Sequence, residues 1–173
     1  HFNVSSTVEI TFEANPDDLT KEYLKGIYNA GVRRLSIGIQ SFQTEFLKKM
    51  NRRHDASQAT EAVTYAAKIG FKDISVDLIY GLPGLKKDEW IADLNKVFKL
   101  PVQHLSAYHL TYHEGTPFYT WLKKGTLKAL KEKESILQFQ LLVQMAKENG
   151  FEQYEISNFA KDQKYSKHNS SYW

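Results

Sequence analysis

Cysteine is absent from the 173 residues of this sequence. Its absence excludes, within these residues, a disulfide framework, a metal site built on thiolates and a cysteine nucleophile. Long apolar runs are absent too, since none approaches the roughly 18 residues that a membrane-spanning helix needs. The N-terminus also lacks the charged head, apolar centre and cleavage site of a signal peptide. We therefore predict a cytoplasmic protein without a membrane span.

Neither sign of charge dominates the chain. Its 23 Lys and Arg against 20 Asp and Glu leave a net charge of +3 without a long basic block, so no nucleic-acid partner is indicated. The length suits one domain but is short for a closed eight-fold barrel, which usually needs roughly 200 to 250 residues. Because the sequence opens at His1 without an initiator Met and stops at Trp173 within an aromatic motif, we expect residues 1–173 to be one domain of a longer gene product.

Segments with strand and helix periodicity alternate along the chain. This order is typical of parallel strands joined by right-handed crossovers, so we predict an α/β fold, an open and partial (β/α) barrel with about five parallel strands. The predicted strands cover residues 8–13, 33–40, 73–80, 104–110 and 152–156, and the predicted helices cover residues 20–31, 45–50, 55–70 and 131–149, with a further helix around Trp90. Asp55, with Gln58 three residues later, predicts a capping box at the start of the helix over residues 55–70. In the last helix, the predicted buried residues are Ile136, Phe139, Leu142, Val143 and Ala146.

The stretch DISVDLIYGLPG, residues 73–84, contains the central strand of this pattern. Ile74, Val76 and Leu78 alternate with Ser75 and Asp77, which places the apolar side chains on one face and the polar ones on the other. A parallel strand covered by protein on both faces would be apolar almost throughout. The polar row therefore predicts that the second face lines a polar cavity, into which Asp77 points.

Three polar residues end successive predicted strands on the same face. Glu13, Gln40 and Asp77 all occupy the polar parity at the C-terminal end of a strand. Ligands of parallel βα architectures bind at this edge, and carboxylates with an amide can bind a ligand that carries hydroxyl groups. The alternative is that these residues cap the rim of the sheet and bind water or loop backbone.

Other polar features of the sequence carry weaker predictions. The loop at residues 81–84 is interpreted as a turn fixed by Pro83, because its spacing matches neither a P-loop nor a dinucleotide fingerprint. Arg52, taken alone, is interpreted as a surface cation. His109 and His113 are four residues apart, but glycine and proline nearby break any helix that would place them on one face, so a metal pair is not predicted.

Several blocks of the sequence match one family in order. RLSIGIQSF, MNRRHD, VDLIYGLPG, LSAYHLTYHEGTPF, YEISNFA and the terminal HNSSYW together resemble the radical S-adenosylmethionine (SAM) proteins related to oxygen-independent coproporphyrinogen III oxidase. The resemblance runs from about Val8 to the end of the chain. Within the family, the YEISNFA block and HNSSYW, which is similar to an HNxxYW motif, resemble the HemW-type haem chaperones.

The resemblance implies a SAM site formed by Glu13, Gln40, Arg52 and Asp77. It implies that Glu13 and Asp77 contact polar parts of SAM, that Gln40 forms hydrogen bonds nearby, and that Arg52 supplies charge for the carboxylate end. Thr111, on the loop after the next strand, is a weaker candidate for the adenine side. The family adds Arg52 to the three residues that strand parity brings together.

The resemblance also implies a haem site at the C-terminus. His168 is the candidate ligand of the haem iron, and Asn169, Tyr172 and Trp173 complete the motif. A neutral imidazole suits iron, and aromatic side chains suit a flat macrocycle. Without the family, a single histidine in a polar tail would be interpreted as a solvated surface residue.

The sequence departs from the family in one respect. Radical SAM proteins hold a [4Fe–4S] cluster on a CxxxCxxC loop followed by a glycine-rich segment, and this chain has neither. We expect both elements upstream of Val8 and a further domain after Trp173 in the parent protein, so that the chain alone is inactive.

The resemblance implies a fragment of a HemW-like protein that binds SAM and haem and transfers haem or a related porphyrin to a recipient protein. The first alternative is an oxygen-independent coproporphyrinogen III oxidase, which uses SAM for oxidative decarboxylation to protoporphyrinogen IX. The second alternative is an unrelated βα-barrel protein that binds a sugar or phosphate.

Overall fold

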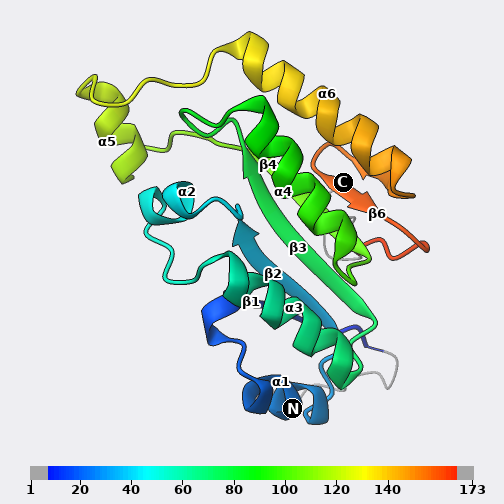
Figure 1. The fold of residues 1–173 in the computed structure, drawn as a ribbon. Coiled ribbons are helices and arrows are strands. Elements are labelled where there is room, and N and C mark those ends of the chain that lie inside the picture. Colours follow the sequence, from blue (N-terminus) through cyan, green and yellow to red (C-terminus); the bar gives the residue numbers. More distant parts are fainter. Residues whose placement is uncertain (1–7, 167–173) are drawn as a thin grey trace.

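The structure is a computed structural model that describes residues 8–166. Its centre is a six-stranded sheet with the strand order β1-β2-β3-β4-β6-β5. The four strands β1 to β4 run parallel to their neighbours, as the alternation of strands and helices predicts, and curve as an open sheet (Figure 1). Their bounds are β1 Thr11–Ala14, β2 Arg34–Gln40, β3 Asp73–Tyr80 and β4 His104–His109. The prediction of a partial, open α/β barrel is confirmed.

The C-terminal end of the sheet differs from the prediction of about five parallel strands. The segment predicted as one last strand forms β5 (Glu152–Glu155), and the chain then turns back as β6 (Asn158–Ala160). β6 pairs antiparallel with both β4 and β5, so the sheet ends in a hairpin. Because β6 is only three residues long, it offers too short a periodic pattern for sequence reasoning to detect.

Helices connect the parallel strands and cover one face of the sheet. Helices α3, α4 and α6 lie in front of the sheet in Figure 1, and α1 packs against α3. α3 begins with a capping box between Asp55 and Gln58, as the sequence predicts, and Thr20 caps α1. The bounds are η1 Pro16–Asp18, α1 Lys21–Asn29, α2 Thr44–Lys49, α3 Ala56–Ile69, α4 Lys87–Lys99, α5 Pro117–Lys123 and α6 Glu132–Glu148.

The hydrophobic core lies between this helical layer and the apolar face of the sheet. Each fully buried Leu, Ile or Val side chain contributes about 1.5–3 kcal/mol, so this layer is the main source of stability. The opposite face of the same strands is polar and is free to line a site. Buried core residues from the strands are Leu35, Ile37, Ile39, Ile74, Val76, Leu78 and Leu105, and those from the helices include Ala59, Val63, Trp90, Leu94, Val97 and Leu142.

The buried face of α6 differs from the predicted one at two positions. Ile136 was predicted to be buried but is 51% exposed, whereas Gln138 is buried. The Gln138 side chain accepts a hydrogen bond from the backbone N–H of Gly81 at 2.8 Å and donates one to the carbonyl of Leu85 at 3.0 Å. The backbone carbonyl of Gln138 accepts a hydrogen bond from the indole N–H of Trp90 at 2.9 Å. A polar residue therefore anchors α6 to the loop after β3.

Candidate functional site

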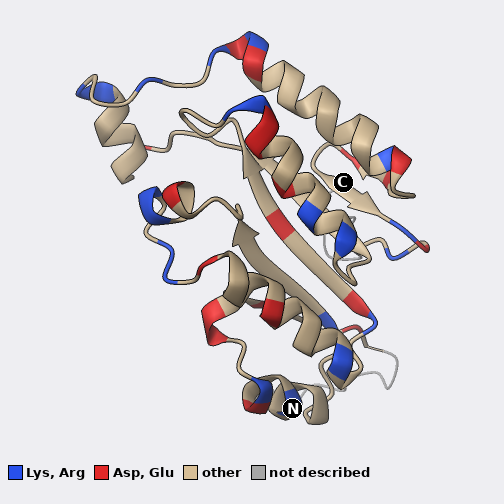
Figure 2. Cartoon of the chain, viewed as in Figure 1, with Lys and Arg blue, Asp and Glu red and all other residues tan. Residues whose placement is uncertain are grey.

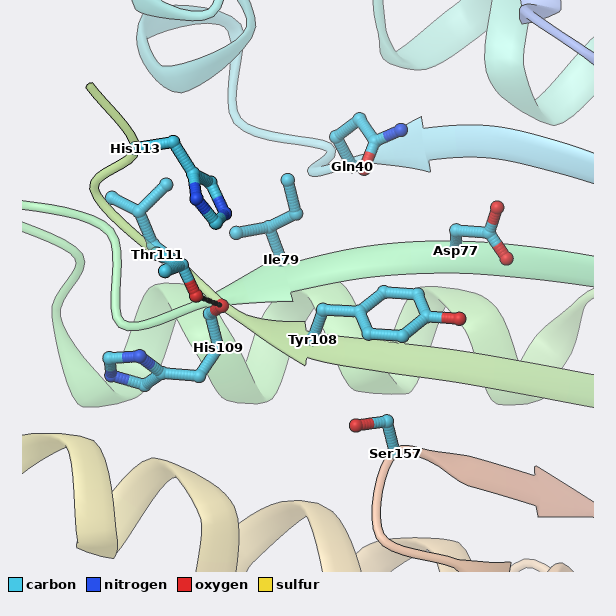
Figure 3. A pocket seen from close by; sticks show the side chains of 9 residues that line it. Gln40, Asp77, Ile79, Tyr108, His109, Thr111, His113 and Ser157 are labelled. Carbon is cyan, nitrogen blue, oxygen red and sulfur yellow. Dashed lines mark hydrogen bonds between the residues drawn. The ribbon is translucent and has the colours of Figure 1, made fainter. Parts of the chain in front are cut away.

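The polar face of the sheet carries a cavity of about 600 Å³ at the C-terminal ends of β3 and β4 (Figure 3). Gln40 and Asp77 form a polar wall, and Ile79 and Tyr108 supply apolar and aromatic surface beside it. Such a mixture suits a small organic ligand with one polar and one flat apolar part. The full lining is Gln40, Asp77, Ile79, Tyr108, His109, Leu110, Thr111, His113 and Ser157.

A second, deeper cavity of about 170 Å³ shares Asp77 and Tyr108 with the first. It is lined almost entirely by polar side chains of β1 to β4, as the predicted polar row requires. Arg34, one of its lining residues, is buried and forms an ion pair with Asp73. Its lining residues are Thr11, Glu13, Arg34, Ser36, Ser75, Asp77, Ser106, Tyr108 and Ser166.

Asp77 lies where the two cavities meet. Burial raises the pKa of its carboxyl group to about 6, although hydrogen bonds from Ser106 and Ser36 partly oppose the shift and nearby Glu13 adds to it. The Ser36 hydroxyl lies 3.3 Å from one carboxylate oxygen of Asp77. Asp73 and Asp77 are the acidic residues of β3, and the rest of this strand is uncharged (Figure 2). The sequence prediction that Asp77 faces a polar cavity is confirmed.

Glu13 lies two strands away from Asp77 on the same face. It is an exposed residue of β1, stands opposite Ser36 of β2 in the parallel ladder, and lines the deeper cavity together with Asp77. Gln40 lines the larger cavity from β2. The three residues predicted from parity thus line two neighbouring cavities, and Asp77 is common to both.

Gln40 has an unusual backbone conformation. Its φ is 70°, in the left-handed region that residues other than glycine rarely adopt. The pairing of β2 with β3 shifts register between Ile37 and Gln40, so the strand is irregular where it meets the cavity. Figure 3 shows the Gln40 side chain at the end of β2 beside the cavity.

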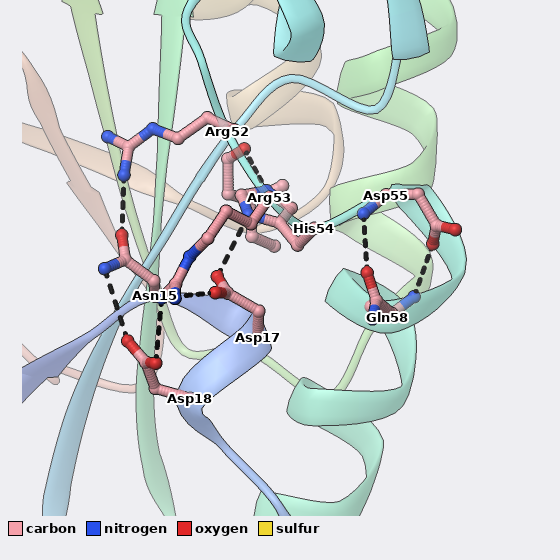
Figure 4. A network of polar contacts seen from close by, with 9 residues as sticks. Asn15, Asp17, Asp18, Arg52, Arg53, His54, Asp55 and Gln58 are labelled. Atoms are coloured by element: carbon pink, nitrogen blue, oxygen red, sulfur yellow. Dashed lines mark hydrogen bonds and ion pairs between the residues drawn. The ribbon is translucent and has the colours of Figure 1, made fainter.

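Arg52 lies beside the site rather than in the lining of either cavity. Its Nη1 donates a hydrogen bond of 2.6 Å to the Asn15 side chain, which directly follows β1 (Figure 4). The neighbouring Arg53 pairs with Asp17 at 2.6 Å, and the buried His54 contacts the carbonyl of Ile39 at 3.1 Å. This segment therefore ties the ends of β1 and β2 together and holds Arg52 at the same edge of the sheet.

Thr111 lines the larger cavity on the loop after β4. Its hydroxyl is turned toward the carbonyl of His109, at 3.4 Å (Figure 3). The structure thus brings Gln40, Asp77 and Thr111 to one cavity. The predicted haem residues His168, Asn169, Tyr172 and Trp173 lie outside the described residues.

Residues 8–166 show neither a cluster of metal-ligating side chains nor a membrane-spanning helix. Within residues 8–166, no group of three His, Asp or Glu side chains is arranged to hold a metal ion. His109 hydrogen-bonds Ser135 at 3.1 Å and packs edge-on against Tyr80. No helix in the described range is long and apolar enough to cross a membrane.

Sequence reasoning missed several residues of the site. Strand alternation places Ser36, Ser106 and Tyr108 on the polar faces of β2 and β4, but they were not among the predicted site residues. Arg34 could not have been found, because an arginine at the start of a strand is usually exposed. Here it is 2% exposed and lines the deeper cavity.

A comparison with protein families decides which fold family this is. The family model described as "Radical SAM superfamily" matches residues 4–97, more than half of the chain. The chain belongs to the radical SAM superfamily. The matched region contains β1, β2, β3 and the Glu13, Gln40, Arg52 and Asp77 positions.

Several curated relatives of this radical SAM chain are HemW haem chaperones. It is 38% identical over 169 residues to the "Heme chaperone HemW" of Bacillus subtilis, covering 98% of this chain and 45% of the relative. It is 39% identical over 167 residues to the HemW of Haemophilus influenzae, covering 96% of this chain and 42% of the relative. The predicted resemblance to HemW-type proteins is confirmed, and the chain spans less than half the length of these relatives.

Solved structures share the fold. Coproporphyrinogen III oxidase (HemN) from Escherichia coli superposes with a TM-score of 0.80 at 23% identity, covering 92% of this chain and 36% of that one. The archaeal Elp3 of Methanocaldococcus infernus gives a TM-score of 0.67 at 25% identity, covering 75% of this chain and 31% of that one. The first likeness is evidence for the fold alone, and it agrees with a partial radical SAM barrel.

The radical SAM superfamily uses SAM and a [4Fe–4S] cluster, and the described residues fit these two groups differently. The polar and aromatic lining of the larger cavity suits the ribose and adenine of SAM. The cluster requires thiolates, and the chain has no cysteine to supply them. The residues of this chain therefore do not fit the cluster.

Proposed function

We propose that this chain forms the adenosyl-binding part of a SAM site in a HemW-like haem chaperone. The observation that carries the proposal is the convergence of Gln40, Asp77 and Thr111 on one cavity at the C-terminal edge of the parallel strands, in a superfamily that uses SAM. The HemW relatives, which match nearly the whole chain, favour a role in haem transfer.

Each site residue has a role that follows from its chemistry. The carboxylates of Asp77 and Glu13 accept hydrogen bonds from the ribose hydroxyls or the methionyl ammonium group, and the Gln40 amide can both donate and accept. Thr111 lies on the adenine side. Arg52, held by Asn15, provides positive charge for the methionyl carboxylate.

Haem binding is the second part of the proposal. By resemblance, His168 supplies an imidazole to the haem iron, with Asn169, Tyr172 and Trp173 beside it. The full protein would then receive haem and pass it to a recipient protein. The coproporphyrinogen III oxidase alternative has less support, because the likeness to HemN concerns the fold alone. The Bacillus subtilis and Haemophilus influenzae relatives, at 38% and 39% identity, are HemW proteins.

Two ligands separate the roles of the SAM residues. SAM carries a methionyl carboxylate, whereas 5′-methylthioadenosine carries the same adenosyl group without it. We expect SAM to bind the purified chain weakly in calorimetric titrations, because no residue here holds the cluster that would bind its methionyl group. 5′-Methylthioadenosine lacks that group, so the missing cluster should not lower its affinity. Gln40→Ala should weaken both ligands about equally, and Arg52→Ala should weaken only SAM. Tight SAM binding, or equal effects of Arg52→Ala on both ligands, would contradict these roles.

A haem titration tests the chaperone proposal. We expect the full-length protein to bind haem with a stoichiometric Soret shift that His168→Ala weakens. His113→Ala is the matched control, because His113 is an exposed histidine beside the larger cavity. Loss of the shift in the control alone would refute the assignment of His168. Anaerobic conversion of coproporphyrinogen with SAM and reductant would favour the oxidase instead.

A further inference from the structure

The position of Gln40 requires support from other residues. Its left-handed φ of 70° lies at the point where β2 leaves its regular register with β3. A residue with a Cβ does not hold such a conformation unless its surroundings determine it, and such residues often occur at binding sites. Neighbouring residues must therefore hold the backbone of Gln40 in this conformation.

Gly38, two residues earlier on the same face of β2, provides space for the Gln40 side chain. A Cβ added to Gly38 would lie 2.8 Å from Nε2 of Gln40, closer than real contacts allow. Gly38 is not among the glycines with positive φ, so its backbone does not require glycine. A side chain at position 38 would therefore displace the Gln40 amide from the place it occupies.

Asp93 of α4 fixes the residues that follow Gln40. It is 1% exposed, and its carboxylate accepts hydrogen bonds from the Ser41 hydroxyl at 2.7 Å and the Gln43 side-chain amide at 2.8 Å. The backbone N–H of Phe42 lies 3.3 Å from the same carboxylate. Three consecutive residues after Gln40 are thus tied to one buried group of the helical layer.

We propose that Gly38 and Asp93 are positioning residues for the SAM site that act through Gln40. Gly38 leaves room for the amide over the strand, and Asp93 holds the turn that sets the left-handed backbone. Neither residue lines the larger cavity, so neither is expected to touch the ligand. The inference rests on the proposed function only in naming the ligand, since the geometry of Gln40 can be measured without one.

A double-mutant cycle tests the role of Gly38. We expect Gly38→Ala to shift the side-chain amide resonances of Gln40 and to weaken 5′-methylthioadenosine binding about 3- to 10-fold, the range of one lost hydrogen bond. In a Gln40→Ala background, Gly38→Ala should have no further effect on binding. Gly26→Ala is the matched control, because Gly26 is exposed in α1 with no atom within 4 Å of an added Cβ.

Asp93→Asn provides an independent test, since asparagine keeps the shape but places an amide N–H₂ against donors. We expect the same Gln40 resonances to shift and the effect on binding to vanish in the Gln40→Ala background. Unchanged Gln40 resonances in both Gly38→Ala and Asp93→Asn would overturn the positioning role. If the resonances shift but the unmodified chain binds no nucleoside, the positioning role stands and the proposed function fails.

Discussion

Replacing Asp77 with asparagine should stabilise the protein in a pH-dependent way. Burial raises the pKa of the Asp77 carboxyl from 3.8 to about 6. Each pKa unit corresponds to about 1.4 kcal/mol, so keeping Asp77 ionised in the folded state costs at most about 3 kcal/mol at neutral pH. The cavity leaves Asp77 partly accessible to water, which makes this figure an upper bound.

The sign of the effect follows from proton linkage. Because the folded state holds the Asp77 proton more tightly than the unfolded state, the contribution of this group to stability is fully present below pH 3.8. This contribution is lost as the pH rises through about 6. Above that pH, the titration of Asp77 no longer changes the stability. Asparagine has a similar shape and does not titrate, so the difference between variant and wild type isolates this group.

Urea denaturation at a series of pH values measures the effect. We expect Asp77→Asn to be more stable than wild type by up to about 3 kcal/mol at pH 7.5, and the difference to shrink toward zero near pH 4. Glu61→Gln, at an exposed position of α3, is the matched control and should change little. An advantage of Asp77→Asn that grows at acid pH, or none at pH 7.5, would refute the reasoning. A destabilising carboxylate retained in a cavity is consistent with a role in binding.

Two further pairs of substitutions test the fold. Gln138→Leu should destabilise the protein by about 2–4 kcal/mol in urea denaturation, because it leaves a buried N–H and a buried carbonyl of the loop after β3 without partners. Gln140→Leu, on the exposed side of α6, should cost much less, and equal losses would show that Gln138 is not an anchor. Gly26→Ala should stabilise α1 by up to about 1 kcal/mol, whereas Gly84→Ala should destabilise because the φ of Gly84 is 88°. Thermal melting of both variants checks this contrast, and a stabilising Gly84→Ala would contradict it.

Much of the parallel part of the fold was predictable from local pattern. The Asp55 and Gln58 pair predicted the start of α3, and the alternation of Ile74, Val76 and Leu78 predicted which face of β3 packs against helices. The β5–β6 hairpin was not predictable, because three residues provide too little periodicity. Gln138 was missed because glutamine is seldom buried unless specific backbone groups are available to it, and those groups come from a distant loop.

The site was predictable only where strand parity applies. Glu13, Gln40 and Asp77 were correctly assigned to one polar face, but parity cannot locate Arg52, which lies on a loop held by Asn15. The left-handed backbone of Gln40 depends on contacts between the turn after β2 and Asp93 of α4, which are distant in sequence. Burial of Asp77 likewise requires the assembled sheet.

The central claim is that the cavity at the ends of β2, β3 and β4 binds the adenosyl group. An NMR titration of the ¹⁵N-labelled chain with 5′-methylthioadenosine tests it most directly. We predict that the perturbed amides cluster around Gln40, Asp77 and Thr111, and that Asp77→Ala abolishes the perturbations. Perturbations centred instead on the apolar groove between α6 and β5, around Val143 and Phe151, or a complete lack of perturbation, would contradict the claim.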